Sequence, residues 1–309
     1  MARPLSRART RPPLPRCEQP LVIAHRGASF EVAEHTLPAY LAAIESGADG
    51  LECDVRLTRD GHLVCVHDRT VNRTSNGRGI VSELDLSGLR ALDFGSWHDE
   101  LPASADDLLA DSPYLQGVAP DRMGGGSSTV LTLETLLGVV ADADRPLKLL
   151  IETKHPTRYG GMVEKELVRL LKRFGWATDP AIDELAAGGP GPTSTAAGPD
   201  YSITIMSFAG VALRRIRLLA PAVPLVQLFE RDTIGRRDGT LPTGVHTAGP
   251  GITILRTEPG YVERVHSAGN RVFCWTVDQP ADIDLVRHLG IDAIITNRPA
   301  AVRAQLGLH

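Results

Sequence analysis

The strongest constraint on the fold is an alternation of short strand-like runs with amphipathic helical patterns along nearly the whole chain. The first apolar run covers 21–25, and the segment 36–47 carries Leu37, Leu41 and Ile44 at helical spacing. Such alternation is typical of α/β proteins with a parallel sheet. About eight strand and helix pairs can be counted, which predicts an α/β fold of the (β/α)8 TIM-barrel type. A doubly wound open sheet is the alternative, because the number of strands does not separate the two.

The individual elements can be predicted from periodicity and from glycine and proline breaks. We expect barrel strands at 21–25, 50–57, 146–154, 201–208, 224–230, 251–256, 271–277 and 292–297. A further run at 62–68 is expected to pair with the second strand across the turn "TRDGH". We expect helices at 36–47, 132–143, 162–175, 210–220, 258–269, 281–290 and 299–307.

Three stretches do not follow this alternation of strands and helices. Residues 1–20 are rich in Arg and Pro and are expected to form a disordered tail before a barrel domain at 21–309. The stretch 71–128 is rich in Asp, Ser, Gly and Pro and has only weak helical patterning. Because an unstructured loop of that length is unusual in a compact domain, we expect a small inserted subdomain there. Residues 184–200 are predicted to form a flexible surface loop.

Composition narrows the partners and the compartment. The formal net charge of -4 gives no reason to expect nucleic acid as a partner. No run approaches the roughly 18 apolar residues of a membrane span, and the first residues lack the apolar core of a secretion signal. Stable membrane insertion is therefore not expected. We expect a cytoplasmic location. Cys17, Cys53, Cys65 and Cys274 lack the spacing of a zinc site and are expected to be reduced thiols. Nothing indicates the oligomeric state.

Charged and polar residues recur at the carboxyl ends of the predicted strands, where (β/α)8 barrels build their active sites. Glu52 and Asp54 lie two residues apart in one strand, so their side chains share one face. Each residue alone is as well explained by a structural role, but a structural role does not predict their recurrence at one end of successive strands. The full set is His25, Arg26, Glu52, Asp54, His67, Glu152, Lys154 and Trp275.

The three carboxylates in this set predict a divalent cation. Glu52, Asp54 and Glu152 would repel one another at one barrel mouth unless a cation lay among them. Hard oxygen ligands without cysteine suit Mg²⁺ or Ca²⁺. With the dication, Arg26 and Lys154 included, the formal charge of the pocket is about +1. Such a pocket suits a monoanion, and a phosphodiester is one.

His25 and His67 supply the remaining chemistry. Cleavage of a phosphodiester needs a base to activate the nucleophile and an acid to protonate the departing alkoxide, and imidazole titrates near neutral pH. Cys65 lies close to His67, but no activating group accompanies it, so a thiol nucleophile is disfavoured. The residues alone therefore predict metal-assisted phosphodiester cleavage.

At this point a family resemblance becomes specific. The motifs "VIAHRGAS", "EHTLPAY", "GADGLECDVRLTRDGHLVCVHD", "IETK", "SFAGVALRRIRLLAP", "CWTVDQ" and "GIDAIITNRP" follow one another from about Leu21 to about Pro299. Together they resemble the glycerophosphodiester phosphodiesterase family. The resemblance implies a (β/α)8 barrel of the phospholipase C-like phosphodiesterase type, with a small subdomain inserted after the second strand region. It also implies hydrolysis of glycerophosphodiesters such as glycerophosphocholine to glycerol 3-phosphate and an alcohol, with one divalent cation.

The resemblance assigns a role to each candidate residue. It makes His25 and His67 the acid and base pair, Glu52, Asp54 and Glu152 the metal ligands, Arg26 and Lys154 phosphate contacts, and Trp275 a wall against the glycerol. Two alternatives remain open. A lipid-active, lysophospholipase D-like relative should carry an apolar membrane-contacting loop, and none is evident. A non-catalytic phosphate-binding relative should have lost a histidine or a carboxylate of the set.

One segment departs from the family pattern. The family most often has Pro-Glu-Asn-Thr where this chain has Ala33, Glu34, His35 and Thr36. Glu-His-Thr is similar to a branch that includes secreted bacterial enzymes, so secretion is the alternative to a cytoplasmic location. Glu34 is expected to border the metal or glycerol site.

Overall fold

The structure is a computed structural model that describes residues 11–99, 128–177, 203–230 and 238–308. The flexible loop predicted at 184–200 lies outside the described residues, as does most of the second half of the predicted insertion.

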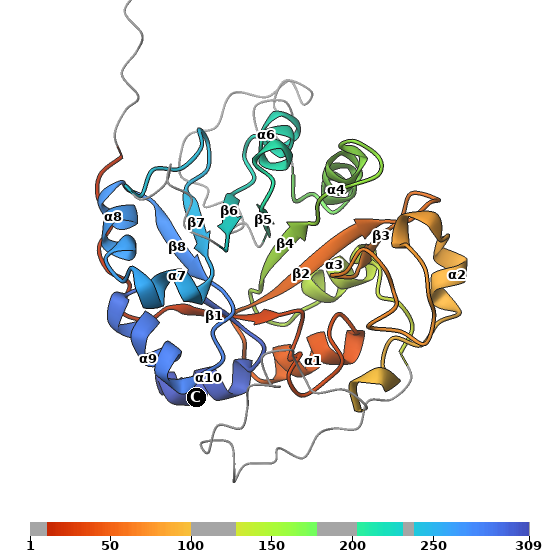
Figure 1. Cartoon of the computed structure of the whole chain (residues 1–309), viewed down its shortest axis with the longest axis horizontal. Helices are drawn as coiled ribbons and strands as arrows, with labels where there is room; N and C mark the ends of the chain where they lie inside the picture. Colours follow the sequence, from red (N-terminus) through yellow and green to blue (C-terminus); the bar gives the residue numbers. More distant parts are fainter. Residues whose placement is uncertain (1–10, 100–127, 178–202, 231–237, 309) are drawn as a thin grey trace, which may run out of the picture.

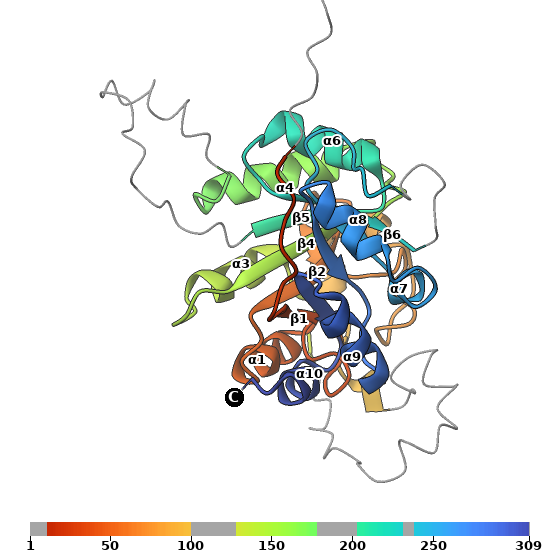
Figure 2. The ribbon, with the colours of Figure 1, turned by 90° about the vertical axis from the view of Figure 1, so that its left-hand side faces the viewer.

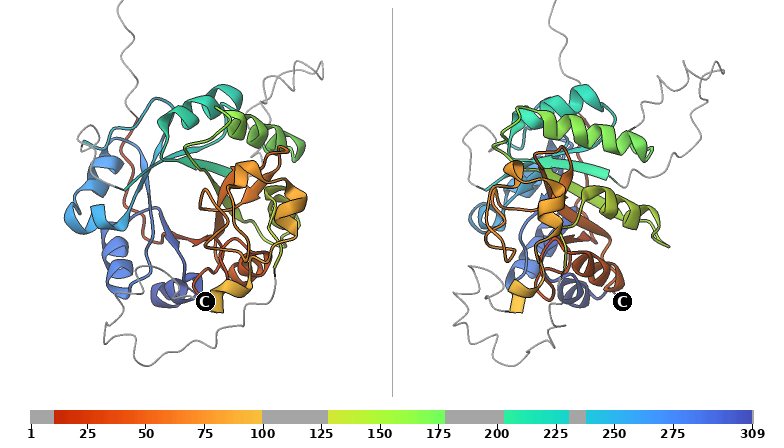
Figure 3. Two further views of the ribbon diagram at one scale, coloured as in Figure 1. Left: turned by 45° about the vertical axis from the view of Figure 1, so that its right-hand side comes forward. Right: turned by 90° about the vertical axis from the view of Figure 1, so that its right-hand side faces the viewer.

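Eight parallel strands of the described chain close into a barrel (Figures 1 and 3). They are β1 (Leu21–His25), β2 (Gly50–Leu57), β4 (Lys148–Thr153), β5 (Ile203–Ser207), β6 (Leu225–Phe229), β7 (Thr247–Pro250), β8 (Arg271–Cys274) and β9 (Ala293–Thr296). The ring closes because β1 pairs with both β2 and β9. The predicted (β/α)8 barrel is therefore confirmed, and the open sheet is excluded. Outside the ring, β3 (Leu63–Cys65) pairs antiparallel with β2.

Helices surround the strands, as the left view of Figure 3 shows. They are α1 (Leu37–Glu45), α3 (Leu133–Ala141), α4 (Met162–Arg173), α6 (Gly210–Leu219), α7 (Ile252–Thr257), α8 (Tyr261–Ser267), α9 (Pro280–Leu289) and α10 (Pro299–Leu306). The first helix begins where the Thr36 hydroxyl accepts a hydrogen bond from the backbone N–H of Ala39. The helices α1 and α10 lie side by side (Figures 1 and 2), so the first and last of these helices are neighbours around the barrel.

One predicted strand is a helix. The run 251–256 has the β-branched residues of a strand, but it forms α7, and the barrel strand is the preceding β7 with the sequence TAGP. Small residues are required there because neighbouring side chains fill the space. A Cβ on Gly249 would meet the side chain of Leu228 at 2.6 Å and that of Val226 at 2.9 Å. Packing against β6 therefore requires small residues in β7, and such residues do not indicate a strand when composition alone is considered.

The inside of the barrel is filled by one apolar layer. It consists of Ile23, Leu150, Met206, Val226, Leu228, Phe273, Ala293 and Ile295. Side chains alternate along a strand, so the face of β1 that carries Ile23 also carries His25, and the face of β4 with Leu150 carries Glu152. The polar residues at the strand ends therefore lie directly above this packed apolar layer. Two larger apolar clusters fill the space between the strands and the helices.

The described part of the predicted insertion has its own apolar cluster. It contains the short elements η1 (Val81–Glu83), α2 (Leu86–Arg90) and η2 (Ser96–Asp99). Its cluster comprises Val64, Val66, Val71, Val81, Leu86, Leu89, Phe94 and Val130. Since Val64 belongs to β3, this cluster anchors the insertion to the barrel. The rest of the insertion, 100–127, lies outside the described residues.

Residues 11–20 differ from the expected disordered tail. The backbone N–H of Leu14 donates to the His266 carbonyl, and that of Cys17 donates to the Gly290 carbonyl. This segment therefore lies against the ends of α8 and α9, while residues 1–10 lie outside the described part of the chain. No helix among the described residues is long and apolar enough to cross a bilayer.

Candidate active site

The predicted site residues meet at the carboxyl ends of the strands. A cavity of about 380 Å³ opens there, and its walls include seven of the eight: His25, Arg26, Glu52, His67, Glu152, Lys154 and Trp275. The eighth, Asp54, is buried beside Glu52 and Glu152. Strand register explains the convergence, because His25 lies opposite Glu52 and Asp54 lies opposite Glu152.

The carboxylates of Glu52, Asp54 and Glu152 form a compact cluster. One oxygen atom from each lies within 4.8 Å of the other two, and all three residues are buried. Oxygen ligands of Ca²⁺ lie about 2.3–2.6 Å from the ion, so opposite ligands are separated by at most about 5 Å. The spacing and the all-oxygen donor set therefore fit a divalent cation of the Mg²⁺ or Ca²⁺ type.

Burial and mutual repulsion set the charges of this cluster. Burial, reinforced by Asp54, raises the pKa of Glu52 well above its usual range and that of Glu152 to about 8. Burial acts in the same direction on Asp54, but Lys154 and Arg26 outweigh it and hold the pKa of Asp54 well below its usual range. Without a metal ion, Glu152 therefore holds a proton near neutral pH. A bound dication would displace it.

Lys154 joins the cluster from the end of β4. Its Nζ lies 2.9 Å from Glu152 Oε1 and 3.4 Å from Asp54 Oδ1. Burial alone would lower the pKa of this ammonium, but the two carboxylates outweigh it and raise that pKa. Lys154 therefore stays charged at the edge of the cavity, where it could reach an anion.

His25 is held by the partly buried amide of Asn297. Its Nδ1 lies 2.7 Å from Asn297 Oδ1, and Asn297 donates through Nδ2 to Asp278 Oδ2 over 2.7 Å. Since Asp278 fixes the amide, an oxygen faces the imidazole, and the hydrogen of a neutral His25 ring lies on Nδ1. The Nε2 lone pair is then left for substrate. Burial, reinforced by Arg26, lowers the pKa of His25 to about 3.

His67 has a different partner. Its Nδ1 lies 2.7 Å from Asp68 Oδ1, and Asp68 also accepts from Arg73 Nε over 2.8 Å. The hydrogen bond from His67 and the contact with Arg73 hold the pKa of Asp68 below its usual range. A carboxylate partner stabilises an imidazolium, which a neutral amide cannot do to the same extent. The two histidines therefore have different partners, a carboxylate for His67 and an amide for His25.

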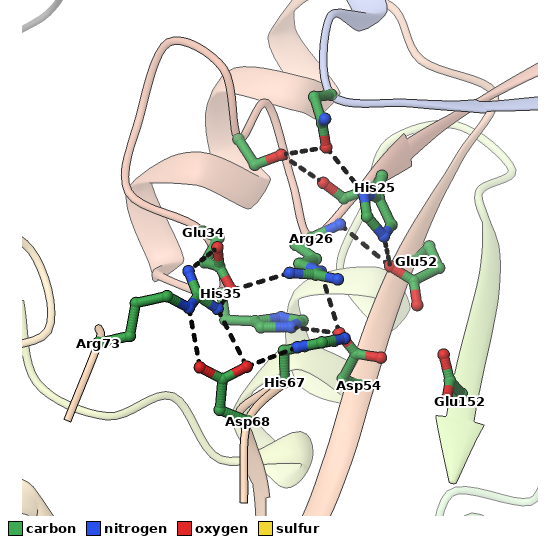
Figure 4. A network of polar contacts seen from close by, with 12 residues as sticks. His25, Arg26, Glu34, His35, Glu52, Asp54, His67, Asp68, Arg73 and Glu152 are labelled. Atoms are coloured by element: carbon green, nitrogen blue, oxygen red, sulfur yellow. Dashed lines mark hydrogen bonds and ion pairs between the residues drawn. The ribbon is translucent and has the colours of Figure 1, made fainter. Parts of the chain in front are cut away.

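A chain of ion pairs connects the two sides of the cavity (Figure 4). Arg73 forms a bidentate pair with Glu34, with distances of 2.8 and 2.7 Å. Glu34 pairs in turn with Arg26 Nη1 over 3.1 Å, and Arg26 Nε lies 3.1 Å from Asp54 Oδ2. The expectation that Glu34 borders the site agrees with this geometry.

The backbone around Arg26 adopts an unusual conformation next to these ion pairs. Arg26 and His35 both adopt left-handed conformations, with φ of 59° and 60°, which are uncommon outside glycine. The backbone N–H of Arg26 lies 3.1 Å from Glu52 Oε2. At Gly27 the φ is 87°, and an added Cβ would meet backbone and side-chain atoms of Ala39 at 2.6–2.8 Å. The closeness of α1 therefore requires glycine at this position, where the chain turns directly after β1.

His35 is a residue that the sequence analysis did not assign. Its Nε2 lies 2.9 Å from Asp54 Oδ2 and its Nδ1 lies 2.8 Å from the Tyr40 hydroxyl. The ring is buried, and burial lowers its pKa. His35 therefore fixes the orientation of Asp54 from behind. The only signal in the sequence was that this position departs from the family pattern.

Two aromatic side chains also line the cavity. The rings of Phe208 and Trp275 meet edge to face with their centroids 5.4 Å apart, and Trp275 Nε1 donates to the Gly249 carbonyl over 2.9 Å. Phe208 was missed because a single uncharged aromatic residue after a strand is equally well explained by packing. Asn297 and Asp278 were missed although both lie in quoted motifs, because nothing local indicates which His they contact.

The expected positive charge of the pocket is not found. The formal charge predicted from the sequence did not include Glu34, Asp68 and the cavity-lining Glu230. The three negative charges of these carboxylates exceed the one positive charge that Arg73 adds. With a dication included, the formal charge of the pocket is about -1. Directed donors such as Lys154, rather than net charge, must therefore select an anion.

Comparison with known proteins places this geometry in a family. The model of the glycerophosphoryl diester phosphodiesterase family matches residues 25–301. The Mycobacterium tuberculosis protein described as "Probable glycerophosphodiester phosphodiesterase 1" is 42% identical over 287 residues, which cover 93% of this chain and 92% of that protein. A Bacillus subtilis glycerophosphodiester phosphodiesterase is 30% identical over 285 residues, covering 90% of this chain and 84% of the relative.

Solved structures share the fold at lower identity. A glycerophosphodiester phosphodiesterase from Agrobacterium tumefaciens superposes with a TM-score of 0.66 at 21% identity, over 93% of this chain and 100% of that one. An Oleispira antarctica phosphodiesterase, solved in complex with sn-glycerol-3-phosphate, gives a TM-score of 0.64 at 20% identity, over 93% and 97% of the two chains. From the match of the family model and the two sequence relatives, we conclude that this chain is an enzyme of the glycerophosphoryl diester phosphodiesterase family.

Proposed function

We propose that the enzyme hydrolyses glycerophosphodiesters such as glycerophosphocholine to glycerol 3-phosphate and an alcohol. The observation that carries this proposal is one cavity bordered by three clustered carboxylates, a charged lysine and two imidazoles with different partners. The names of the relatives and the glycerol 3-phosphate bound to the Oleispira antarctica protein support the substrate class.

Glu52, Asp54 and Glu152 would hold one divalent cation, Mg²⁺ or Ca²⁺. When bound, that ion supplies Lewis acidity and neutralises charge on the non-bridging phosphate oxygens. Lys154 and Arg26, which line the same cavity, would contact this phosphate and stabilise the charge that grows on it in the transition state. Trp275 and Phe208 border the glycerol.

The two histidines divide the proton transfers. His25, whose Nδ1 carries its hydrogen toward Asn297, accepts the proton of the nucleophile at Nε2. His67, whose Nδ1 contacts Asp68, donates a proton from Nε2 to the leaving alcohol as the phosphorus–oxygen bond breaks. Water and the glycerol 2-hydroxyl of the substrate both fit as nucleophile. A substrate that lacks the 2-hydroxyl separates them, because only direct attack by water cleaves it.

The proposal is tested by a coupled assay for glycerol 3-phosphate release from glycerophosphocholine. We expect activity with Mg²⁺ or Ca²⁺, loss of activity with EDTA, and a fall in kcat of about 10²-fold or more in His67→Asn. The exposed His62 provides a matched control, and His62→Asn should retain activity. Full activity in EDTA or in His67→Asn would refute this mechanism. Preferred cleavage of lysophosphatidylcholine would instead favour the lipid-active alternative.

The cellular location is part of the proposal. Cys53, Cys65 and Cys274 are buried, and thiols of this kind are typical of reducing compartments. We therefore retain the cytoplasm, with secretion as the alternative. Measuring the enzyme activity in separated culture medium and cell lysate distinguishes the two.

A further inference from the structure

A second cavity of about 350 Å³ lies next to the catalytic one. It is bordered by the end of β2, by η1 of the insertion, and by the loop between β4 and α4. Lys154 lines both cavities, so a ligand held in one is adjacent to the other. No step of the mechanism above uses this second cavity.

The walls of the second cavity are strongly basic. Arg56, Arg69 and Arg158 line it, and Glu83 is the one carboxylate among its described lining residues. Arg158 Nη1 lies 2.9 Å from Glu83 Oε1. Within the described chain, neither Arg56 nor Arg69 has a carboxylate within ion-pair distance. Apart from the shared Lys154, the cavity therefore carries about two uncompensated positive charges.

Arg56 continues the line of site residues along β2. Glu52, Asp54 and Arg56 alternate with outward-facing residues and so share one face of the strand. At about 3.3 Å per residue, Arg56 lies about 7 Å beyond Asp54 along the strand. Its Nε and Nη2 donate to the His67 carbonyl over 3.0 and 2.7 Å, which fixes the guanidinium while Nη1 stays available.

The two sides of the second cavity are tied together. The Tyr159 hydroxyl donates to the Ser82 carbonyl over 2.7 Å, and the ion pair of Arg158 with Glu83 joins the same two segments. Ser82 and Thr157 place hydroxyl-bearing residues on the walls, and Val81 and Val163 contribute apolar surface. A defined basic pocket of this composition suits a phosphate group, because guanidinium donors match its oxygens in pairs.

We propose that this second cavity binds a further phosphate on the leaving alcohol, so that the preferred substrates are glycerophosphodiesters with a second anionic phosphate. This inference rests on the proposed function, because the first phosphate must occupy the catalytic cavity. A three-carbon alcohol between two phosphates suits the spacing from Asp54 to Arg56. Bis(glycerophospho)glycerol has this arrangement, whereas glycerophosphoglycerol lacks the second phosphate and glycerophosphocholine carries a cation in its place.

Kinetics with matched substrates test this specificity. We expect the wild-type enzyme to have a kcat/KM for bis(glycerophospho)glycerol at least tenfold above that for glycerophosphoglycerol. The double variant Arg69→Gln/Arg158→Gln should lower that ratio about tenfold. Arg169→Gln removes the same kind of charge from the exposed face of α4 and should leave the ratio unchanged. A wild-type ratio near one, or an equal loss in Arg169→Gln, would overturn the proposal.

Equilibrium binding separates this inference from the reaction itself. Calorimetry should give a Kd for glycerol 1,3-bisphosphate about tenfold below that for glycerol 3-phosphate, and the double variant should abolish the difference. Equal affinities in the wild type would contradict the second site even if the enzyme is active. Conversely, a wild-type protein that releases glycerol 3-phosphate from neither diester refutes the proposed function, while the calorimetric difference still tests the second site.

Discussion

The amide of Asn297 lies behind the proposed catalytic base, and its partner Asp278 is partly buried. Burial raises the pKa of Asp278, against hydrogen bonds from Thr296 and Asn297 that oppose it. The carboxyl of Asp278 receives the Asn297 side chain, the Asn297 backbone N–H and the Thr296 hydroxyl, each over 2.7–2.8 Å. The orientation of His25 therefore depends on residues that never reach the substrate.

This arrangement predicts the effect of Asn297→Ala. Without the amide oxygen, the imidazole loses the contact that fixes its tautomer, so kcat should fall about 10–100-fold while KM changes little. Steady-state kinetics with glycerophosphocholine measure both constants. Ser29 also lies 2.8 Å from Asn297 Oδ1 but leaves Asp278 in place, so Ser29→Ala should have a much smaller effect. Equal losses in the two variants would contradict the prediction.

The place of Glu152 in the carboxylate cluster predicts that metal binding stabilises the folded protein. This stabilisation can be measured without an activity assay. Added Ca²⁺ should raise the unfolding temperature of EDTA-treated protein by about 5 °C or more at about 100 times its Kd. Glu152→Gln removes one ligand of the cluster and should abolish most of this shift. Glu166→Gln makes the same change in charge at an acidic residue of α4 that pairs with Arg169, and should keep the shift. Unchanged shifts in both variants would exclude Glu152 as a ligand.

At the residue scale, the sequence identified most of the charged groups around the cavity and missed groups that orient them. His25 and Glu152 stand at the carboxyl ends of their strands, where (β/α)8 barrels build their active sites. Asn297 contacts His25 across 272 positions of sequence, and such a pairing leaves no local pattern. The identity of a partner depends on barrel register, which is fixed only in the folded molecule.

Among the elements, the insertion after β3 contributes directly to the site through Arg73. Its guanidinium pairs with both Glu34 and Asp68, and it lies 5.8 Å from the centre of the Trp97 ring in η2. Because Asp68 orients His67, the insertion helps to position the proposed acid. The insertion expected from the sequence therefore contributes a residue to the proposed active site.

We expect Arg73→Gln to lower kcat about tenfold or more, since both Glu34 and Asp68 lose their cation. Kinetics with glycerophosphocholine should show the loss mainly in kcat. The pair of Arg59 with Asp85 also joins the barrel to the insertion, but far from His67. Arg59→Gln should therefore leave kcat within about twofold, and a comparable loss in both variants would point to general loosening of the insertion instead.

Sequence predicted most elements because local periodicity and packing agree in them. The helices α4 and α9 carry strong amphipathic patterns, and both lie where they were predicted. In contrast, β7 is a strand only because β6 and β8 supply its neighbours. The rule that failed at 251–256 is β-propensity, which describes a fit to surrounding strands more than a preference of the residue itself.

On the scale of the whole molecule, one carboxyl group couples stability to pH away from the metal cluster. Glu31 Oε2 is buried without a hydrogen-bond partner among the described residues. Burial raises the pKa of Glu31 to about 7, against a backbone hydrogen bond and Arg298 that oppose it. An unfolded chain has a Glu pKa near about 4.3. The folded protein therefore holds an extra proton between these values, and its stability falls as pH rises from about 4.5 to 7.

Replacement of this carboxyl should remove the effect. Relative to wild type, Glu31→Gln should raise the free energy of unfolding at pH 8 by on the order of 2 kcal/mol and should change it little at pH 4.5. Thermal or denaturant unfolding at the two pH values measures the difference. The exposed Glu263 gives a control in which Glu263→Gln has no such dependence. A gain of equal size at both pH values would contradict the assignment.

Closure of the barrel through β1 also has a consequence for translation. The first strand, β1, pairs with the last strand, β9. His25 can therefore contact the Asn297 amide only after a further 272 residues have been synthesised. At about 5–20 residues per second, that interval lasts roughly 15–50 s. Throughout it, the nascent chain presents an open edge of β1 to the chaperones at the ribosome exit. The enzyme therefore becomes competent only once its last strand has emerged, and a prematurely terminated chain that ends before β9 is left without a working base.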